Sequence, residues 1–334
     1  MIETRVLSTL KLFDFQEVPL TLLELHKFLL QDASAILSAT DSRFELTESS
    51  VYQDSEIALC EILEVLDALV FAGRVETSQG YYVLPGKKVN IEKRLRSYQF
   101  GIERERRIAR FLPYTKYIPF IRGIAVGGSQ ALGIEREESD IDLLVITHPK
   151  YIWTARTFLT FYFHILGVRR YKHFITNRFC LNHYIAGNKL LTRDKNLYTA
   201  MEYARLRGVV YGEVIEEFKI KNQDWERLIF PHLPIYNELL APTVPAPLVQ
   251  RWTERLLTKI FGSRLEEWLA NWQVARIKKD ELILVGHDEL SFHHVGKQKR
   301  LLVDFYDYLS NMVGPKLEVV VVTETVTLEG EVGI

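Results

Sequence analysis

Apolar residues in the first 87 positions recur at helical spacing before the pattern changes to that of a β-hairpin. Several of them share one face of a first predicted helix: Val6, Leu7, Leu10 and Phe13. Thr21, with Glu24 three residues later, forms a capping-box pattern that predicts a second helix ending at Leu30. The polar segment 31–53 is interpreted as a loop or an insertion.

A third predicted helix begins near Ser55 and ends at Gly73, a residue type common just beyond helix ends. A turn at 78–80 between two short β-rich runs then predicts a hairpin. Helices followed by a hairpin are typical of a winged helix, so we expect a winged-helix domain over 1–87. The third helix carries acids and no Lys or Arg over 56–70. Docking to a protein or a second copy therefore explains this domain at least as well as binding to nucleic acid.

The rest of the chain divides into further regions with their own patterns. Residues 88–115 are strongly charged and predict a largely exposed linker helix, and 116–215 alternate apolar strands with helices. Residues 216–316 are interpreted as a mainly helical region with a small hairpin, and a proline cluster at 242–247 interrupts it. The tail 317–334 is interpreted as a strand or a disordered end. The fold class expected is α+β with a mixed α/β centre. The elements predicted from residue 121 onward are strands over 121–126, 140–147 and 179–185, helices over 153–166 and 196–206, one long helix over 248–272, short strands over 275–285 and 289–293, and a helix over 301–311.

Composition and charge exclude some classes of protein. The chain has 334 residues and a formal net charge of −1, so as a whole it attracts neither nucleic acid nor an anionic membrane. Cys60 and Cys180 lie in apolar contexts and are interpreted as buried, reduced thiols rather than a disulfide or zinc site. The N-terminal run carries acids, unlike a signal peptide, and the apolar segment 151–167 is short for a membrane crossing. We therefore expect a cytoplasmic protein without a membrane partner.

Two aspartates in the central unit point to chemistry. Side chains alternate along a strand, so Asp140 and Asp142 share one face, while Ile141 and Leu143 point into the core. Two carboxylates on one face repel each other unless a cation lies between them, and Mg²⁺ binds carboxylate oxygens together with phosphates. The alternative is a pair at a strand edge that faces solvent.

The turn upstream of these aspartates, Gly127-Gly128-Ser129, leads into a short helix predicted over 130–132. Backbone N–H groups and the Ser129 hydroxyl at that helix start can bind a phosphate, and glycines let a ligand approach the backbone. The segment is neither a P-loop, because the lysine is missing, nor a dinucleotide fingerprint, nor a G-x-S-x-G elbow. A phosphate cradle beside metal-binding carboxylates is the arrangement used for two-metal phosphoryl or nucleotidyl transfer.

At these residues the chain resembles the DNA polymerase β-like nucleotidyltransferase superfamily. The resemblance rests on Gly128-Ser129, a spacer over 130–139, and Asp140-Ile-Asp142 followed by apolar residues, and it covers about residues 118–200. With a winged helix in front, the wider arrangement resembles bacterial nucleotidyltransferase-domain proteins. The resemblance implies that the turn (Gly127, Gly128 and Ser129) binds a nucleoside triphosphate. It also implies that Asp140 and Asp142 are catalytic and hold Mg²⁺ or Mn²⁺.

The superfamily usually adds a third carboxylate on a later strand, here the one predicted over 179–185, which contains no acid. Asn182 is the tentative occupant of the third position, with His183 next to it. An asparagine ligates weakly and cannot take a proton. Asp194 and Glu202 lie nearby in the sequence.

Two hypotheses for function follow. The first is an Mg²⁺-dependent nucleotidyltransferase that moves a nucleoside monophosphate from an NTP to a hydroxyl of RNA, a protein or a small molecule, with release of pyrophosphate. The second is a nucleotide-binding regulator, weakly active or inactive, whose winged helix binds DNA or a protein partner. A basic run over 169–173 is interpreted as a contact for nucleotide phosphates or an RNA backbone, or as a solvated loop.

Overall fold

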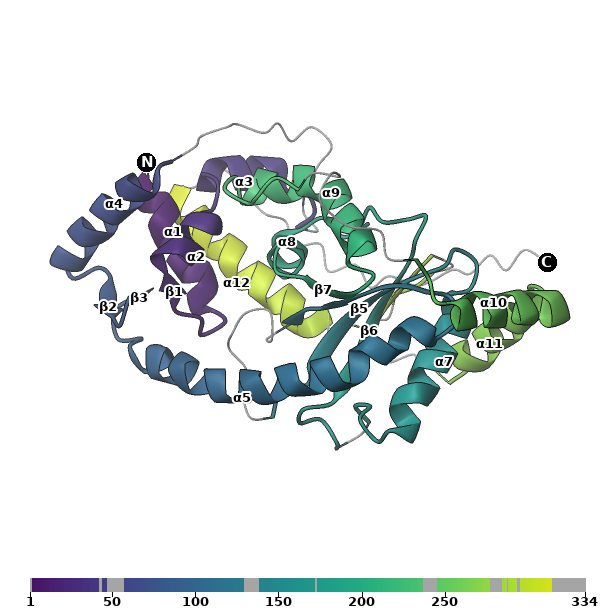
Figure 1. Cartoon of the computed structure of the whole chain (residues 1–334). Coiled ribbons are helices and arrows are strands. Elements are labelled where there is room, and N and C mark those ends of the chain that lie inside the picture. The colour runs from purple at the N-terminus through teal and green to yellow at the C-terminus, as the bar shows by residue number, and fades with distance from the viewer. Residues whose placement is uncertain are drawn as a thin grey trace.

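The structure, a computed structural model, is a mixed α and β protein with two separate sheets (Figure 1). This confirms the mixed helix and strand content expected from the sequence. The smaller sheet lies among the N-terminal helices, and the larger one forms the centre of the molecule. The described residues are 2–41, 44–46, 57–128, 138–171, 173–236, 245–276, 284–286, 288–292 and 295–313.

The N-terminal part combines a group of helices with a three-stranded sheet of order β1-β3-β2. Its elements are α1 (Ile2–Asp14), β1 (Leu20–Thr21), α2 (Leu22–Lys27), α3 (Ala33–Ala39), α4 (Leu59–Phe71), β2 (Glu76–Ser78) and β3 (Tyr81–Val83). The expected capping box is present, because the Thr21 hydroxyl accepts from Glu24 N–H and the Glu24 carboxylate accepts from Thr21 N–H. Gly73 follows α4 with a φ of 68°, a conformation that glycine adopts without strain.

Several expectations for this part are wrong in detail. The second helix ends at Lys27 rather than Leu30. The segment 31–53 contains a helix, α3, whose Ile36 is buried, while 42–43 and 47–53 lie outside the described residues. Cys60 is exposed rather than buried, because α4 turns its opposite face to the core, and Cys180 is half-buried. Both cysteines are free thiols, as expected.

A long helix, α5 (Val89–Phe111), leads from the small sheet to the centre of the molecule, where η1 (Leu112–Tyr117) follows (Figure 1). The helix is present as predicted, but it is not exposed throughout, since Arg94 and Arg104 are buried. Arg94 pairs with Glu24 of α2 at 3.0 Å, and Arg104 donates to the Ser139 carbonyl oxygen at 3.0 Å. A buried charge requires such partners. Arg94 therefore holds α5 against α2, and Arg104 holds it against the segment that precedes β5.

The central sheet has the strand order β7-β4-β5-β6-β9-β8. Its strands are β4 (Ile121–Val126), β5 (Ile141–Thr147), β6 (Phe179–Ala186), β7 (Arg207–Val210), β8 (Leu284–Val285) and β9 (Glu289–Ser291). β5 and β6 are parallel, and the other neighbouring pairs are antiparallel. β5 is apolar on both faces because Leu144 and Ile146 point into one core while Leu143 and Val145 point into another.

Helices cover both faces of this sheet. They are α7 (Ile152–Ile165), α8 (Leu197–Tyr203), α9 (Gly212–Ile229), α10 (Leu248–Phe261), α11 (Arg264–Val274) and α12 (Val295–Val313). α8, α9 and α12 share one core with the N-terminal helices, and α7 and α11 share the other with the end of α5. The cavity lined by Asp140 and Asp142 lies where β4, β5, β6 and α8 meet.

Some expectations for the C-terminal half are corrected. The single helix predicted over 248–272 is two helices, because Gly262 adopts a φ of 55° and ends α10. Of the strand predicted over 275–285, only Leu284–Val285 is a strand, and 277–283 lie outside the described residues. The helix predicted over 130–132 and the tail 317–334 lie outside them too. In the part of the chain that the structure describes, no helix has the length and apolar character needed to cross a bilayer.

Candidate functional site

The glycine turn after β4 lies directly against the strand that carries the aspartates. Gly127 N–H donates to the Asp142 carbonyl oxygen at 3.0 Å. Gly128 has a φ of 64°, and a Cβ built on it would lie 2.2 Å from the Asp142 carboxylate. A side chain at this position would therefore both strain the backbone and displace Asp142. Ser129, the third predicted residue of the turn, lies outside the described residues.

The two aspartates open on one cavity of about 240 Å³, which Gly127 and Gly128 also line. Asp140 immediately precedes β5, and Asp142 is its second residue. Together with the Cys180 thiol of β6, they place ligand atoms within 4.8 Å of one another. The structure thus brings the predicted carboxylates and the predicted glycine turn to the same place.

Arg170 provides a positive charge at this cavity. It follows α7 and donates to the Asp140 carboxylate at 2.7 Å and to the Cys180 sulfur at 3.4 Å. The basic run over 169–173 therefore contributes at least one residue to the cavity, where its charge is paired with Asp140. Lys172, in the same run, lies outside the described residues.

The Asp142 carboxyl has an unusual proton affinity. Burial, followed by the negative charges of Asp140 and Glu202, raises its pKa to about 7, and the charge of Arg170 opposes this shift. The raised pKa means that the free site holds a proton on Asp142 more readily than an ordinary carboxyl does. A divalent cation between the aspartates would replace that proton and relieve the repulsion.

Asn182 reaches Asp142 from the neighbouring parallel strand β6, whose register pairs Asp142 with Cys180 and shifts before His183. Its side-chain amide donates to the Asp142 carboxylate at 2.9 Å, and it lines the cavity. His183, the next residue, is buried and its Nε2 lies 3.0 Å from the Glu289 carboxylate of β9. The predicted third position is therefore an amide that holds Asp142 in place, and the histidine beside it is engaged elsewhere.

Glu202, which the sequence placed only near the third position, also lines the cavity. Tyr198 and Glu202, four residues apart on α8, both line the cavity and are hydrogen-bonded to each other. The interaction with Glu202, together with burial, raises the pKa of the Tyr198 phenol well above its usual value. The only available signal was the spacing of four on a helix that follows the third strand. Asp194 instead interacts with Glu289 and His183.

The donor set favours a hard cation. Burial and the neighbouring carboxylates raise the pKa of the Cys180 thiol far above its usual value, so the sulfur stays protonated at neutral pH. Zn²⁺ binds thiolates, whereas Mg²⁺ and Mn²⁺ take carboxylate oxygens. Asp140 and Asp142 thus suit Mg²⁺ or Mn²⁺, with the remaining ligands left to phosphate oxygens and water.

Comparison of the chain with protein-family models, with curated proteins and with solved structures found no match.

Proposed function

We propose that this chain is an Mg²⁺-dependent nucleotidyltransferase of the DNA polymerase β-like kind. The observation that carries the proposal is the convergence of Asp140, Asp142 and the Gly127-Gly128 turn on one cavity. A nucleoside triphosphate would place its phosphates against the turn and share the metal with the two aspartates. The metal, when bound, neutralises phosphate charge as the reaction proceeds.

In this proposal Glu202 supplies the third carboxylate in place of an acid on β6. It lines the same cavity as the aspartates, and its negative charge contributes to the raised pKa of Asp142. An acceptor hydroxyl would bind between Glu202 and the α-phosphate. Its oxygen forms a bond to the α-phosphorus, the bond to the bridging oxygen breaks, and pyrophosphate leaves with that electron pair. The hydroxyl proton passes to Glu202.

We place a winged helix in the N-terminal part, formed by α1, α2 and α4 with the β2–β3 hairpin. The outward face of α4 exposes Glu61, Glu64 and Asp67 and no basic residue. Phosphate-rich DNA would be repelled by this face, so we assign it to protein docking. The acceptor substrate is then a protein or a molecule that a docked protein delivers.

A second candidate function is that of a nucleotide-binding regulator without catalysis. The hydrogen bond from Asn182 to Asp142, at the position where the superfamily usually has an acid, favours it. The two candidate functions differ in the role of Glu202. An enzyme needs it as a proton acceptor, whereas a regulator needs only a metal and a nucleotide. Calorimetry distinguishes them: a regulator binds NTP and loses affinity in Asp142→Ala, yet yields no pyrophosphate with any acceptor.

The test is a transfer assay with each NTP labelled at its α-phosphate, Mg²⁺ or Mn²⁺, and a cell extract as the source of acceptors. We expect label transfer that is lost in Asp140→Asn and reduced by about 10²-fold or more in Glu202→Gln, the size typical of a general base. The matched control is Glu217→Gln, an exposed carboxylate on α9, which should leave transfer unchanged. Absence of transfer with every NTP, or transfer that survives Asp140→Asn, would rule the enzyme out.

A further inference from the structure

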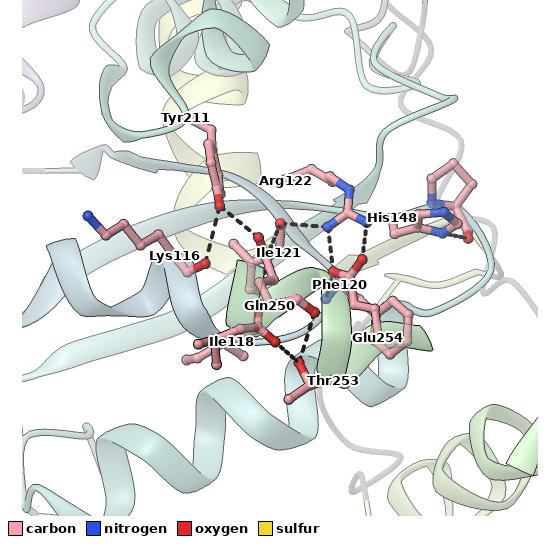
Figure 2. A network of polar contacts seen from close by, with 12 residues as sticks. Lys116, Ile118, Phe120, Ile121, Arg122, His148, Tyr211, Gln250, Thr253 and Glu254 are labelled. Atoms are coloured by element: carbon pink, nitrogen blue, oxygen red, sulfur yellow. Dashed lines mark hydrogen bonds and ion pairs between the residues drawn. The ribbon is translucent and has the colours of Figure 1, made fainter. Parts of the chain in front are cut away.

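Helix α10, at one end of the molecule, is attached to the protein by its polar side (Figures 1 and 2). Gln250 is buried, and its amide donates to the carbonyl oxygens of Ile118 and Ile121 at 2.8 and 2.9 Å. The Tyr211 hydroxyl donates to the same amide's oxygen at 2.7 Å. These contacts satisfy backbone groups where η1 meets β4, and they fix the rotation of α10 about its axis.

Glu254, one turn further along α10, continues this inward polar row (Figure 2). Its carboxylate accepts from Phe120 N–H at 2.6 Å and from both terminal nitrogens of Arg122 at 2.7 and 2.8 Å. A two-pronged arginine–carboxylate pair has a defined geometry and adds to the anchoring of the helix. The only acid of α10 is therefore turned inward and neutralised.

The apolar side of α10 consequently faces solvent. The outward residues and their exposed fractions are Leu248 78%, Val249 57%, Trp252 64%, Leu256 40% and Ile260 59%. At helical spacing these residues occupy one continuous arc of the surface. A surface helix of a globular protein normally turns such an arc to the core, so its exposure marks an interaction surface.

Basic residues border this arc. Arg251, Arg255 and Lys259 are exposed and recur every four residues, each directly before one of the apolar positions. Since Glu254 is neutralised inside, the outward charge of α10 is entirely positive. The helix therefore presents an apolar stripe with a cationic edge, although the whole chain has a net charge of −1.

The neighbouring helix α11 repeats this arrangement. Its Glu266 points inward and accepts from the backbone N–H groups of Trp153 and Thr154 at 2.8 Å each. Its Trp268 and Trp272 are exposed and stacked on each other, with ring centres 6.3 Å apart. Both helices thus add polar anchors to the inward contacts of Leu257 and Leu269, and leave other large apolar side chains outside.

We propose that the outward face of α10 binds the surface of an anionic phospholipid bilayer. Amphipathic helices with Trp, Leu and Ile on one side and Arg or Lys beside them lie in the headgroup region, where the cations meet lipid phosphates. Tryptophan in particular favours this interface. The proposal differs from the expectation of no membrane partner, which rests on the charge of the whole chain.

Other occupants fit this face less well. A second copy would bring two cationic edges together, which is repulsive. Single-stranded nucleic acid would use the cations and the ring of Trp252, but the rest of the arc, Leu248, Val249, Leu256 and Ile260, is aliphatic and offers no ring on which bases stack. An anionic bilayer satisfies the aliphatic stripe and the cationic edge together.

The test is cosedimentation of the full chain with phosphatidylcholine vesicles that contain either no phosphatidylglycerol or about 30% of it. We expect binding at least about tenfold tighter to the anionic vesicles, and weaker at high salt. Trp252→Ala with Leu256→Ala, and separately Arg251→Glu with Arg255→Glu and Lys259→Glu, should each weaken binding by about tenfold or more. The matched charge control, Arg96→Glu with Lys299→Glu and Arg300→Glu, alters exposed cations on α5 and α12 and should bind as the unaltered chain does.

Three outcomes would overturn the proposal. The first is equal binding to both kinds of vesicle, or none to either. The second is a dimer in sedimentation velocity that the Trp252→Ala variant dissociates, which would make the occupant a second copy. The third is binding to single-stranded RNA or DNA that the same variant abolishes while vesicle binding is absent. All altered side chains are exposed, and circular dichroism verifies that each variant is folded.

Discussion

Two carboxyl groups in this protein, the half-buried Asp142 of β5 and the buried Glu226 of α9, share a raised pKa but differ in their access and neighbours. The pKa of Asp142 is raised to about 7 and that of Glu226 to about 8, and burial is the largest cause in both. Asp142 opens on a cavity of about 240 Å³ beside a second carboxylate and a turn that only glycine can form. Glu226 is 1% exposed and is not among the residues that line this cavity.

The difference shows what a perturbed carboxyl does and does not indicate. Lys219 and Lys27 oppose the shift at Glu226, and within the described part of the chain its Oε1 has no hydrogen-bond partner. Burying the Glu226 carboxyl where α9 packs against the N-terminal helices therefore costs free energy. At Asp142 the same physical cause, desolvation, acts where a ligand can enter and a cation can replace the proton. Access for a ligand and the presence of neighbouring donor atoms, rather than a raised pKa, therefore distinguish a candidate site from a carboxyl that is merely buried.

The largest effect we expect is at Gly128. The Gly128→Ala variant should weaken Mn²⁺ binding by more than about a hundredfold, because its Cβ would lie 2.2 Å from the Asp142 carboxylate and must displace a ligand. Calorimetric titration with Mn²⁺ measures this. Gly86→Ala is the matched control, since Gly86 has a similar φ of 78° and nothing within 4 Å of its added Cβ. It should bind Mn²⁺ normally and lose only about 1–2 kcal/mol of stability to backbone strain. Equal binding losses in both variants would contradict the assigned contact.

The next effect concerns Glu226 and the free energy of unfolding. Its pKa rises from 4.5 to about 8 on folding, so the folded chain keeps a proton that the unfolded chain releases. Its contribution to stability is therefore complete below pH 4.5 and is lost as the pH rises to about 8. Glu226→Gln should raise the free energy of unfolding at pH 8 by roughly 2 kcal/mol and change it little at pH 4.5. Urea unfolding at the two pH values, with Glu217→Gln as the exposed control, measures the difference. An equal gain in the free energy of unfolding at the two pH values would show that the proton on Glu226 is not responsible.

A smaller effect is expected for the pH dependence of metal binding at Asp142. Because its pKa is about 7, a cation must displace a proton below this pH but not above it. The affinity for Mn²⁺ should fall by about tenfold per pH unit below 7 and level off above 8. Binding measured across this range in the unaltered chain and in Asp142→Asn tests it. Affinity that is flat with pH would contradict the assignment of Asp142 as the protonated ligand.

The smallest effect is expected at Cys180. Its protonated thiol lies beside the carboxylates without acting as a ligand, so Cys180→Ser should change Mn²⁺ affinity by less than about threefold. Parallel titrations with Mn²⁺ and Zn²⁺ measure this. A large loss of Zn²⁺ affinity in the variant, with Zn²⁺ bound more tightly than Mn²⁺ in the unaltered chain, would make the centre a thiolate site instead.

Much of the local structure follows from the sequence. The capping box at Thr21 and the hairpin depend on contacts a few residues apart, the strands that flank the site follow from their own apolar runs, and the structure contains them all. The common face of Asp140 and Asp142 follows from the alternation of a strand. The glycine requirement at position 128 was expected for ligand access, and the structure adds the contact with Asp142.

The tertiary structure alone decided which distant residues join the site and which face of α10 is outside. Glu202 reaches the cavity on α8, whose Tyr203 stacks on His183 of β6, while Asp194, also nearby in the sequence, interacts with Glu289 and His183. Periodicity would place the apolar arc of α10 against the core, but unpaired backbone groups near β4 attract Gln250 and Glu254 instead. Local propensity and spacing act within one element, whereas the rotation of α10 depends on hydrogen-bond partners more than a hundred residues away, and the position of Glu202 depends on how α8 packs.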